Sequence, residues 1–357
     1  MHYKEDWRRA QEVFAAWWRR ELDYPVVQVF SPRAGIAPDA GWDAWAFLKH
    51  RDNPQVVIDQ FEAYCAGTFF GGEAFPNMFM NLGPGVLAAY FSGYLHFDAA
   101  AATSWFEQPR PWDAVEALSF REDNPWWRYT REITELACDA ARDRFLVSMT
   151  DVGGAADVLA SLRGTEALLE DMLVAPDGVH AMLDRIDGAW SRVYNDLDAI
   201  IGRAQRGTTA WMGLWCPGRW YPLQCDYAAM ISPDMFREFV APSLVRERRA
   251  LDHALYHWDG PGQLPHLDAL LDIPELDGIQ WVPGDGNPPC DAPRWFPLYK
   301  RILDADKLLV LQIIGDPGNV PAMIDALPNK GRLLFSLWLP SEDAARAFLR
   351  SIRGSMT

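Results

Sequence analysis

The segment HALYHWDGPG, residues 253–262, joins a short apolar run to two polar side chains, His257 and Asp259, and then to two glycines. An apolar run of this length, bounded by turn residues, is typical of a buried strand in a parallel sheet. Similar runs recur at 25–30, 144–149, 208–214, 276–281, 307–314 and 332–338. Longer helical patterns fill the intervals, so the chain is expected to be an α/β protein built from βα units.

Helix signals support this alternation. Ser232 followed by Pro233 predicts a helix start, and Pro176 divides the pattern around it into two amphipathic helices. Ser341 is expected to cap a last helix that ends at Gly354.

The length of 357 residues suits one (β/α)8 barrel. We therefore expect a single domain over 1–357, with an N-terminal helical extension over about 1–23. The Gly-, Pro- and aromatic-rich region 66–128 is interpreted as loops and insertions over the C-terminal face of the barrel.

Charge and cysteine content narrow the function classes. The net charge of −16 argues against nucleic acid or an anionic membrane as partner, because either would require a positive surface. The five cysteines lack CxxC spacing and are interpreted as buried thiols. The charged N-terminus and the absence of a run of about 18 apolar residues predict a cytoplasmic protein.

In a barrel, chemistry is carried by the C-terminal ends of the strands. His257 and Asp259 end one predicted strand, and alternation sends both side chains to one face with Trp258 on the other. The other polar and aromatic residues at or just beyond strand ends are Asp151, Trp211, Trp215, Gln280, Trp281, Gln312, Ser336 and Trp338. We predict catalytic roles for His257, Asp259 and Asp151, and substrate binding for Trp258 and the remaining residues of that set.

The chain resembles the uroporphyrinogen decarboxylase superfamily, which includes zinc-dependent methylcobamide methyltransferases. The resemblance is carried by DYPVVQVFSPRAG (23–35), GGEAFPNMFMNLGPGVLAAYFSG (71–93), ASLRGTEALLEDMLVAPDGVHAML (160–183), ISPDMFREFVAPSLVRERRAL (231–251) and LQIIGDPGNV (311–320). It implies one (β/α)8 barrel, often a homodimer, with a cleft at the C-terminal face. Asp226 falls at a family-like position near that cleft and is expected to bind substrate.

The pattern departs from the decarboxylase branch. That branch places two arginines just after the first strand, where this chain has only Arg33, and its essential Asp falls at Asn81. Its C-terminal Gly-His element corresponds to SLWLP (336–340), which contains no His. These departures argue against a tetrapyrrole substrate, while Arg33 and Asn81 remain candidate substrate contacts.

The methyltransferase branch binds zinc through His-x-Cys and a second Cys. Here the motif reads His257-Trp258-Asp259, and the second position falls near Ser336. Imidazole and carboxylate can still hold Zn²⁺ or a harder cation, with help from Asp316 or Glu73. Without metal, His257 and Asp259 would form a general acid/base pair. The structural alternative is that they bond neighbouring backbone and cap a loop.

Three functions are compatible with these sequence features. The first is methyl transfer to or from a small substrate in a Trp-rich cleft, with a corrinoid protein as a candidate partner. The second is decarboxylation or lysis of an aromatic or carbohydrate-like acid through His257 and Asp259, with Arg33 holding a carboxylate. The third is a carbohydrate-active or ligand-binding barrel.

Overall fold

A seven-stranded, mostly parallel sheet forms the centre of the computed structural model, which describes residues 1–36 and 41–354. Its strand order is β2–β1–β13–β12–β11–β10–β9. The strands are β1 (Val26–Pro32), β2 (Thr68–Gly72), β9 (Trp220–Gln224), β10 (His253–Asp259), β11 (Gly278–Val282), β12 (Leu308–Leu311) and β13 (Leu333–Trp338). β2 runs antiparallel to β1, and the other neighbours pair in parallel. The predicted α/β architecture is confirmed, whereas closure into eight strands stays a prediction.

Six short strands form three further ladders. They are β3 (Asn77–Phe79) with β6 (Leu146–Ser148), β4 (His96–Asp98) with β5 (Thr103–Trp105), and β7 (Thr208–Thr209) with β8 (Trp215–Cys216). The β3–β6 pair is parallel. The amide of Met149, just after β6, donates to the carbonyl of Thr209 at 2.9 Å and so links β6 to β7.

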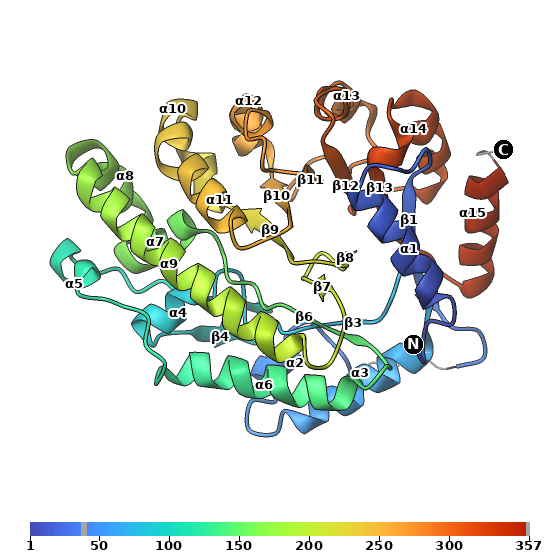
Figure 1. Cartoon of the computed structure of the whole chain (residues 1–357), viewed down its shortest axis with the longest axis horizontal. Coiled ribbons are helices and arrows are strands. Elements are labelled where there is room, and N and C mark those ends of the chain that lie inside the picture. Colours follow the sequence, from blue (N-terminus) through green and yellow to red (C-terminus); the bar gives the residue numbers. More distant parts are fainter. Residues whose placement is uncertain (37–40, 355–357) are drawn as a thin grey trace.

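Helices surround these strands (Figure 1). The first group is α1 (Trp7–Trp18), α2 (Ala46–Lys49), α3 (Gln55–Gly67), α4 (Leu87–Ser92), α5 (Trp112–Glu116), α6 (Pro125–Ala141), α7 (Ala155–Arg163), α8 (Thr165–Val174) and α9 (Pro176–Ile201). The second group is α10 (Pro233–Met235), α11 (Ala241–Arg248), α12 (Leu267–Leu271), α13 (Phe296–Asp304), α14 (Val320–Ala326) and α15 (Glu342–Gly354). Short 3₁₀ turns lie at Asp226–Met230, Pro261–His266, Pro293–Trp295, Pro317–Asn319 and Lys330–Arg332, and a π turn lies at Phe236–Val240.

The sequence signals for helix ends are confirmed. The hydroxyl of Ser232 accepts from the amide of Met235 at 3.2 Å, and that of Ser341 accepts from Ala344 at 3.2 Å. α9 begins at Pro176. All five cysteines are free and buried, as predicted.

Two sequence predictions need correction. The apolar run 208–214 forms a strand only at Thr208–Thr209 and then turns back towards β8, with Gly213 at a positive φ of 70°. The strand beside β10 is instead β9. The sequence does not predict β9, because it contains Pro222 and proline is unusual within a central strand. The region 66–128, expected to be loops, contributes β2, β3, β4 and β5 as well as helices.

Within the described residues, we find no helix with the length and apolar character required to cross a membrane.

Candidate functional site

Asp226, His257 and Asp259 meet at the C-terminal ends of two neighbouring strands. Asp226 begins the turn after β9, and the other two residues are among the last three residues of strand β10. One donor atom of each residue lies within 4.8 Å of the donor atoms of the other two. His257 and Asp259 are half-buried and Asp226 is exposed, so the group is open to a ligand. We call these three residues the trio.

A chain of side-chain amides orients the imidazole. The carbonyl of Met212 can only accept, so the Nε2 amide of Gln312 donates to it at 2.9 Å. The Oε1 atom of Gln312 then accepts from Nε2 of Gln280. This leaves Oε1 of Gln280 facing Nδ1 of His257 at 2.6 Å. Because that oxygen can only accept, the network assigns a proton to Nδ1 and leaves the lone pair of the neutral ring on Nε2.

The turn over residues 210–213, which replaces the end of the predicted strand, is held by three side-chain amides, two on strands β1 and β3 and one just after β12. Gln28 donates to the carbonyl of Gly213 at 2.8 Å, Asn77 to that of Ala210 at 3.0 Å, and Gln312 to that of Met212. Trp211, at the tip, lies edge-on to His257 with ring centroids 4.9 Å apart. The turn therefore sets an indole against the imidazole of the trio.

Asp259 contributes a carboxylate oxygen that lacks a donor. Its Oδ1 atom is buried and has no hydrogen-bond partner. Burial raises the pKa of Asp259, His257 opposes that shift, and Asp226 adds to it. A buried acceptor without a donor is unfavourable and calls for an explanation, such as an ion. One imidazole nitrogen and two carboxylates are also a donor set that divalent transition metals accept.

Two further buried acids lie next to the trio. Oδ1 of Asp151 accepts from the amide of Gly153 at 3.0 Å and from Nε2 of Gln224 at 3.1 Å. Burial, and then the charge of Asp226, raises the pKa of Asp151 to about 6. Asp157 was not singled out from the sequence. Its Oδ1 accepts from the amide of Tyr227 at 2.7 Å, and burial raises its pKa to about 8.

Three of the tryptophans expected to line the ligand pocket are structural instead. Trp258 and Trp281 are fully buried on the opposite strand face from His257, with ring centroids 4.8 Å apart. Strand alternation causes this, because the register pairs Trp258 with Trp281 and His257 with Gln280. Trp215 is also buried; its indole donates to the carbonyl of Arg206 at 3.0 Å and its ring contacts Trp7.

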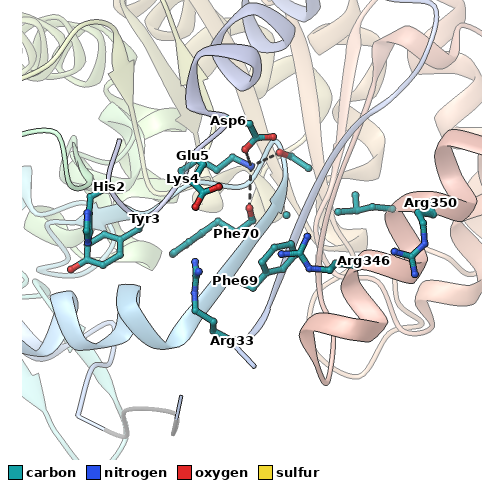
Figure 2. A pocket seen from close by; sticks show the side chains of 13 residues that line it. His2, Tyr3, Lys4, Glu5, Asp6, Arg33, Phe69, Phe70, Arg346 and Arg350 are labelled. Carbon is teal, nitrogen blue, oxygen red and sulfur yellow. Dashed lines mark hydrogen bonds and ion pairs between the residues drawn. The ribbon is translucent and has the colours of Figure 1, made fainter. Parts of the chain in front are cut away.

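Arg33 lines a different cavity, of about 380 Å³, to which no trio residue contributes. Figure 2 shows Arg33 there with Phe69, Arg346 and Arg350, while Lys4 donates to the carbonyl of Phe70 in the edge strand β2 at 3.0 Å. The Arg33 guanidinium donates to the carbonyl of Thr68. The structure thus corrects the expectation that Arg33 holds a substrate carboxylate beside His257.

The remaining candidates make other contacts. Asn81 shapes a turn, since its amide donates to Ala44 and its oxygen accepts from Gly83. Trp338 is 55% exposed and stacks on Phe30 with centroids 6.0 Å apart. Ser336 lies beside Gln28 in the β1–β13 register.

The third member of the trio, Asp226, is not one of the two additional ligands suggested from the sequence. Oδ1 of Asp316 accepts from the amide of Gly318 at 2.8 Å within its own turn. Glu73 pairs with Arg9 at 3.2 Å. Asp226, expected to bind substrate, takes the position beside His257 and Asp259 because parallel pairing of β9 with β10 brings the two strand ends together.

A comparison with solved structures identifies a similar fold. The chain resembles a methyltransferase from Methanosarcina mazei with a TM-score of 0.60 and 12% sequence identity, over 98% of this chain and 99% of that one. No protein-family model matches the chain, and no curated protein matches it. At this identity the likeness shows a shared fold.

Proposed function

We propose that this protein is a metal-dependent enzyme that transfers a one-carbon group, with a divalent cation held by Asp226, His257 and Asp259. The observation that carries the proposal is the convergence of three donor atoms within 4.8 Å. The unpartnered Oδ1 of Asp259 supports it, as does the hydrogen bond that leaves Nε2 of His257 with its lone pair.

The donor set indicates which cation fits. Two carboxylates and one imidazole are harder than the His and two Cys ligands of the zinc-dependent methyltransferases that the sequence resembles, so Zn²⁺ competes here with Mn²⁺ or Fe²⁺. Protein donors around such an ion stand about 2.0–2.2 Å from it. Two donors on one ion therefore lie at most about 4.4 Å apart, so a trio whose donor atoms lie within 4.8 Å of one another would draw together on binding a cation.

The residues around the proposed cation would have different roles in the reaction. When bound, the cation would act as a Lewis acid that lowers the pKa of a substrate nucleophile. Gln280 keeps His257 in the tautomer that presents Nε2, and Trp211 covers one side of the ring and limits access of water. Asp151, buried next to the trio, would accept or return a proton.

Methyl transfer is the reaction we favour, because the solved structure with the similar fold is a methyltransferase and the sequence motifs resemble the methyltransferase branch. A corrinoid-carrying protein would then supply or receive the methyl group. We further propose that the strands close as a (β/α)8 barrel in one domain and that the chain forms a homodimer.

Acid/base decarboxylation by His257 and Asp259 is the competing reaction. The geometry favours it less, because Nδ1 of His257 is bound to the neutral amide of Gln280 and not to a carboxylate that would orient a general base. Metal dependence separates the two reactions.

Stopped-flow spectroscopy of methylcobalamin tests the proposal. Protein loaded with Zn²⁺ or Mn²⁺ should demethylate methylcobalamin with at least one acceptor from a panel of thiols, phenols and amines. His257→Gln should abolish this activity, and Trp338→Ala should retain it. Absence of demethylation with every metal and acceptor would refute methyl transfer.

A further inference from the structure

A cavity of about 320 Å³ adjoins the trio and shares Asp226 with it. It lies between the segment around β5, helix α7 and the turn after β9. We propose that this cavity binds a cationic, alkylammonium-type group of the substrate; the inference rests on the proposed function and adds the substrate class.

The charge of the lining is one-sided. Three acidic side chains, those of Glu107, Asp157 and Asp226, line the cavity, and no Lys, Arg or His is among the described residues that line it. An anionic substrate group would therefore meet repulsion with no compensating cation. A substrate ammonium would supply the positive charge that the lining lacks.

Asp157 offers one specific acceptor atom for a substrate cation. Its Oδ1 accepts from the amide of Tyr227 at 2.7 Å, whereas its Oδ2 is buried and has no hydrogen-bond partner. A buried carboxyl oxygen is normally paired, so an ammonium hydrogen or a polarised N-methyl group at Oδ2 would satisfy it and would replace the proton that burial favours on Asp157.

Aromatic rings supply the second element of cation recognition. Trp105, Phe106 and Tyr227 line the same cavity. Trp105 is 41% exposed and stacks on His96 with centroids 5.9 Å apart, and the Tyr227 hydroxyl is anchored on the carbonyl of Thr165 at 3.3 Å. Aromatic faces beside carboxylates are the usual recognition elements for quaternary ammonium groups.

The position of Asp226 gives the substrate an orientation. Because Asp226 lines the cavity and also belongs to the trio, a substrate anchored by its cationic end would extend its other end towards His257. The cavity would then select substrates by charge at a point separate from the reacting atom.

Calorimetric titration with choline and with its uncharged isostere 3,3-dimethylbutan-1-ol tests this inference. Choline should bind at least about tenfold more tightly than the isostere, and Trp105→Ala should weaken choline binding about tenfold. Asp157→Asn should weaken it too, while Trp338→Ala, which removes an exposed indole outside the cavity, should leave it unchanged. The comparison of the two ligands on the unaltered protein remains decisive even where Asp157→Asn fails to fold.

Equal affinity for the two ligands, absence of binding at millimolar choline, or choline binding unaffected by Trp105→Ala would each overturn the inference. The titration is repeated after chelation with EDTA. Choline selectivity that persists in chelated protein supports the cavity even where no metal binds, so failure of the metal proposal and failure of the cation site give different results.

Discussion

Nδ1 of His257 lies 2.6 Å from Oε1 of Gln280, and the two residues are neighbours in the parallel register of β10 and β11. Gln280 is in turn bonded to Gln312, which is fixed on a backbone carbonyl. An amide network that starts at a carbonyl and ends at an imidazole has only one hydrogen-bond direction. Partners of this kind fix the tautomer and orientation of metal-binding histidines.

Gln280→Leu should therefore weaken metal binding without removing a metal ligand. The imidazole would lose the acceptor that holds the proton on Nδ1, and we expect affinity to fall about 10- to 100-fold. Competition titration with a chromophoric chelator measures the affinity, and ¹⁵N NMR of the ring reports the tautomer. Gln55→Leu, at an exposed position of α3, is the matched control. Unchanged affinity and tautomer in Gln280→Leu would show that the amide network does not orient His257.

Trp258→Ala should destabilise the protein while leaving the trio able to bind metal. The indole is fully buried, packs on Trp281 and donates to the carbonyl of Gln263 at 2.8 Å. Its removal should cost about 3–5 kcal/mol in urea unfolding. Trp338→Ala, which shortens an exposed side chain, should cost about 1 kcal/mol or less. If Trp258→Ala lost metal but kept its stability, Trp258 would belong to the site and the assignment of strand faces would be wrong.

Glu247→Gln should make stability less dependent on pH. Glu247 lies on α11, is buried, and has an Oε1 atom without a hydrogen-bond partner. Burial, and then Asp187, raise its pKa well above the ordinary value of 4.5, so the folded state holds the proton more tightly than the unfolded state. The resulting stability is present below pH 4.5 and is lost as pH rises through the folded pKa.

Urea midpoints at pH 5 and pH 8 measure this effect. We expect the glutamine variant to match the original protein at pH 5 and to exceed it at pH 8. Glu132→Gln, an exposed change on α6, should follow the original protein at both pH values. The same loss of stability between the two pH values in Glu247→Gln would exclude Glu247 as its source.

The sequence is sufficient to predict those strands whose apolar runs are uninterrupted. β10, β11, β12 and β13 all fall within or close to the predicted runs. The sequence does not predict β9, because Pro222 is unusual in a central strand. Residues 208–214 resemble one strand, because their apolar character does not show the turn at Gly213.

The site was predictable in part for a similar reason. Alternation along one strand is local, so it correctly set His257 and Asp259 on one face. The same rule sends Trp258 and Trp281 to the strand face opposite His257. Their expected role in the ligand pocket is inconsistent with that alternation. The meeting of Asp226 with His257 depends on the register between β9 and β10, which a single sequence does not reveal.

Metal analysis of the purified protein tests the central claim most directly. After incubation with Zn²⁺ or Mn²⁺ and removal of free ions, inductively coupled plasma mass spectrometry should find one metal ion per chain. His257→Gln and Asp259→Asn should each reduce this to well below one, and Asp316→Asn should retain it. Absence of metal in the original protein, or equal metal content in all three variants, would contradict the assignment of Asp226, His257 and Asp259 as a metal site.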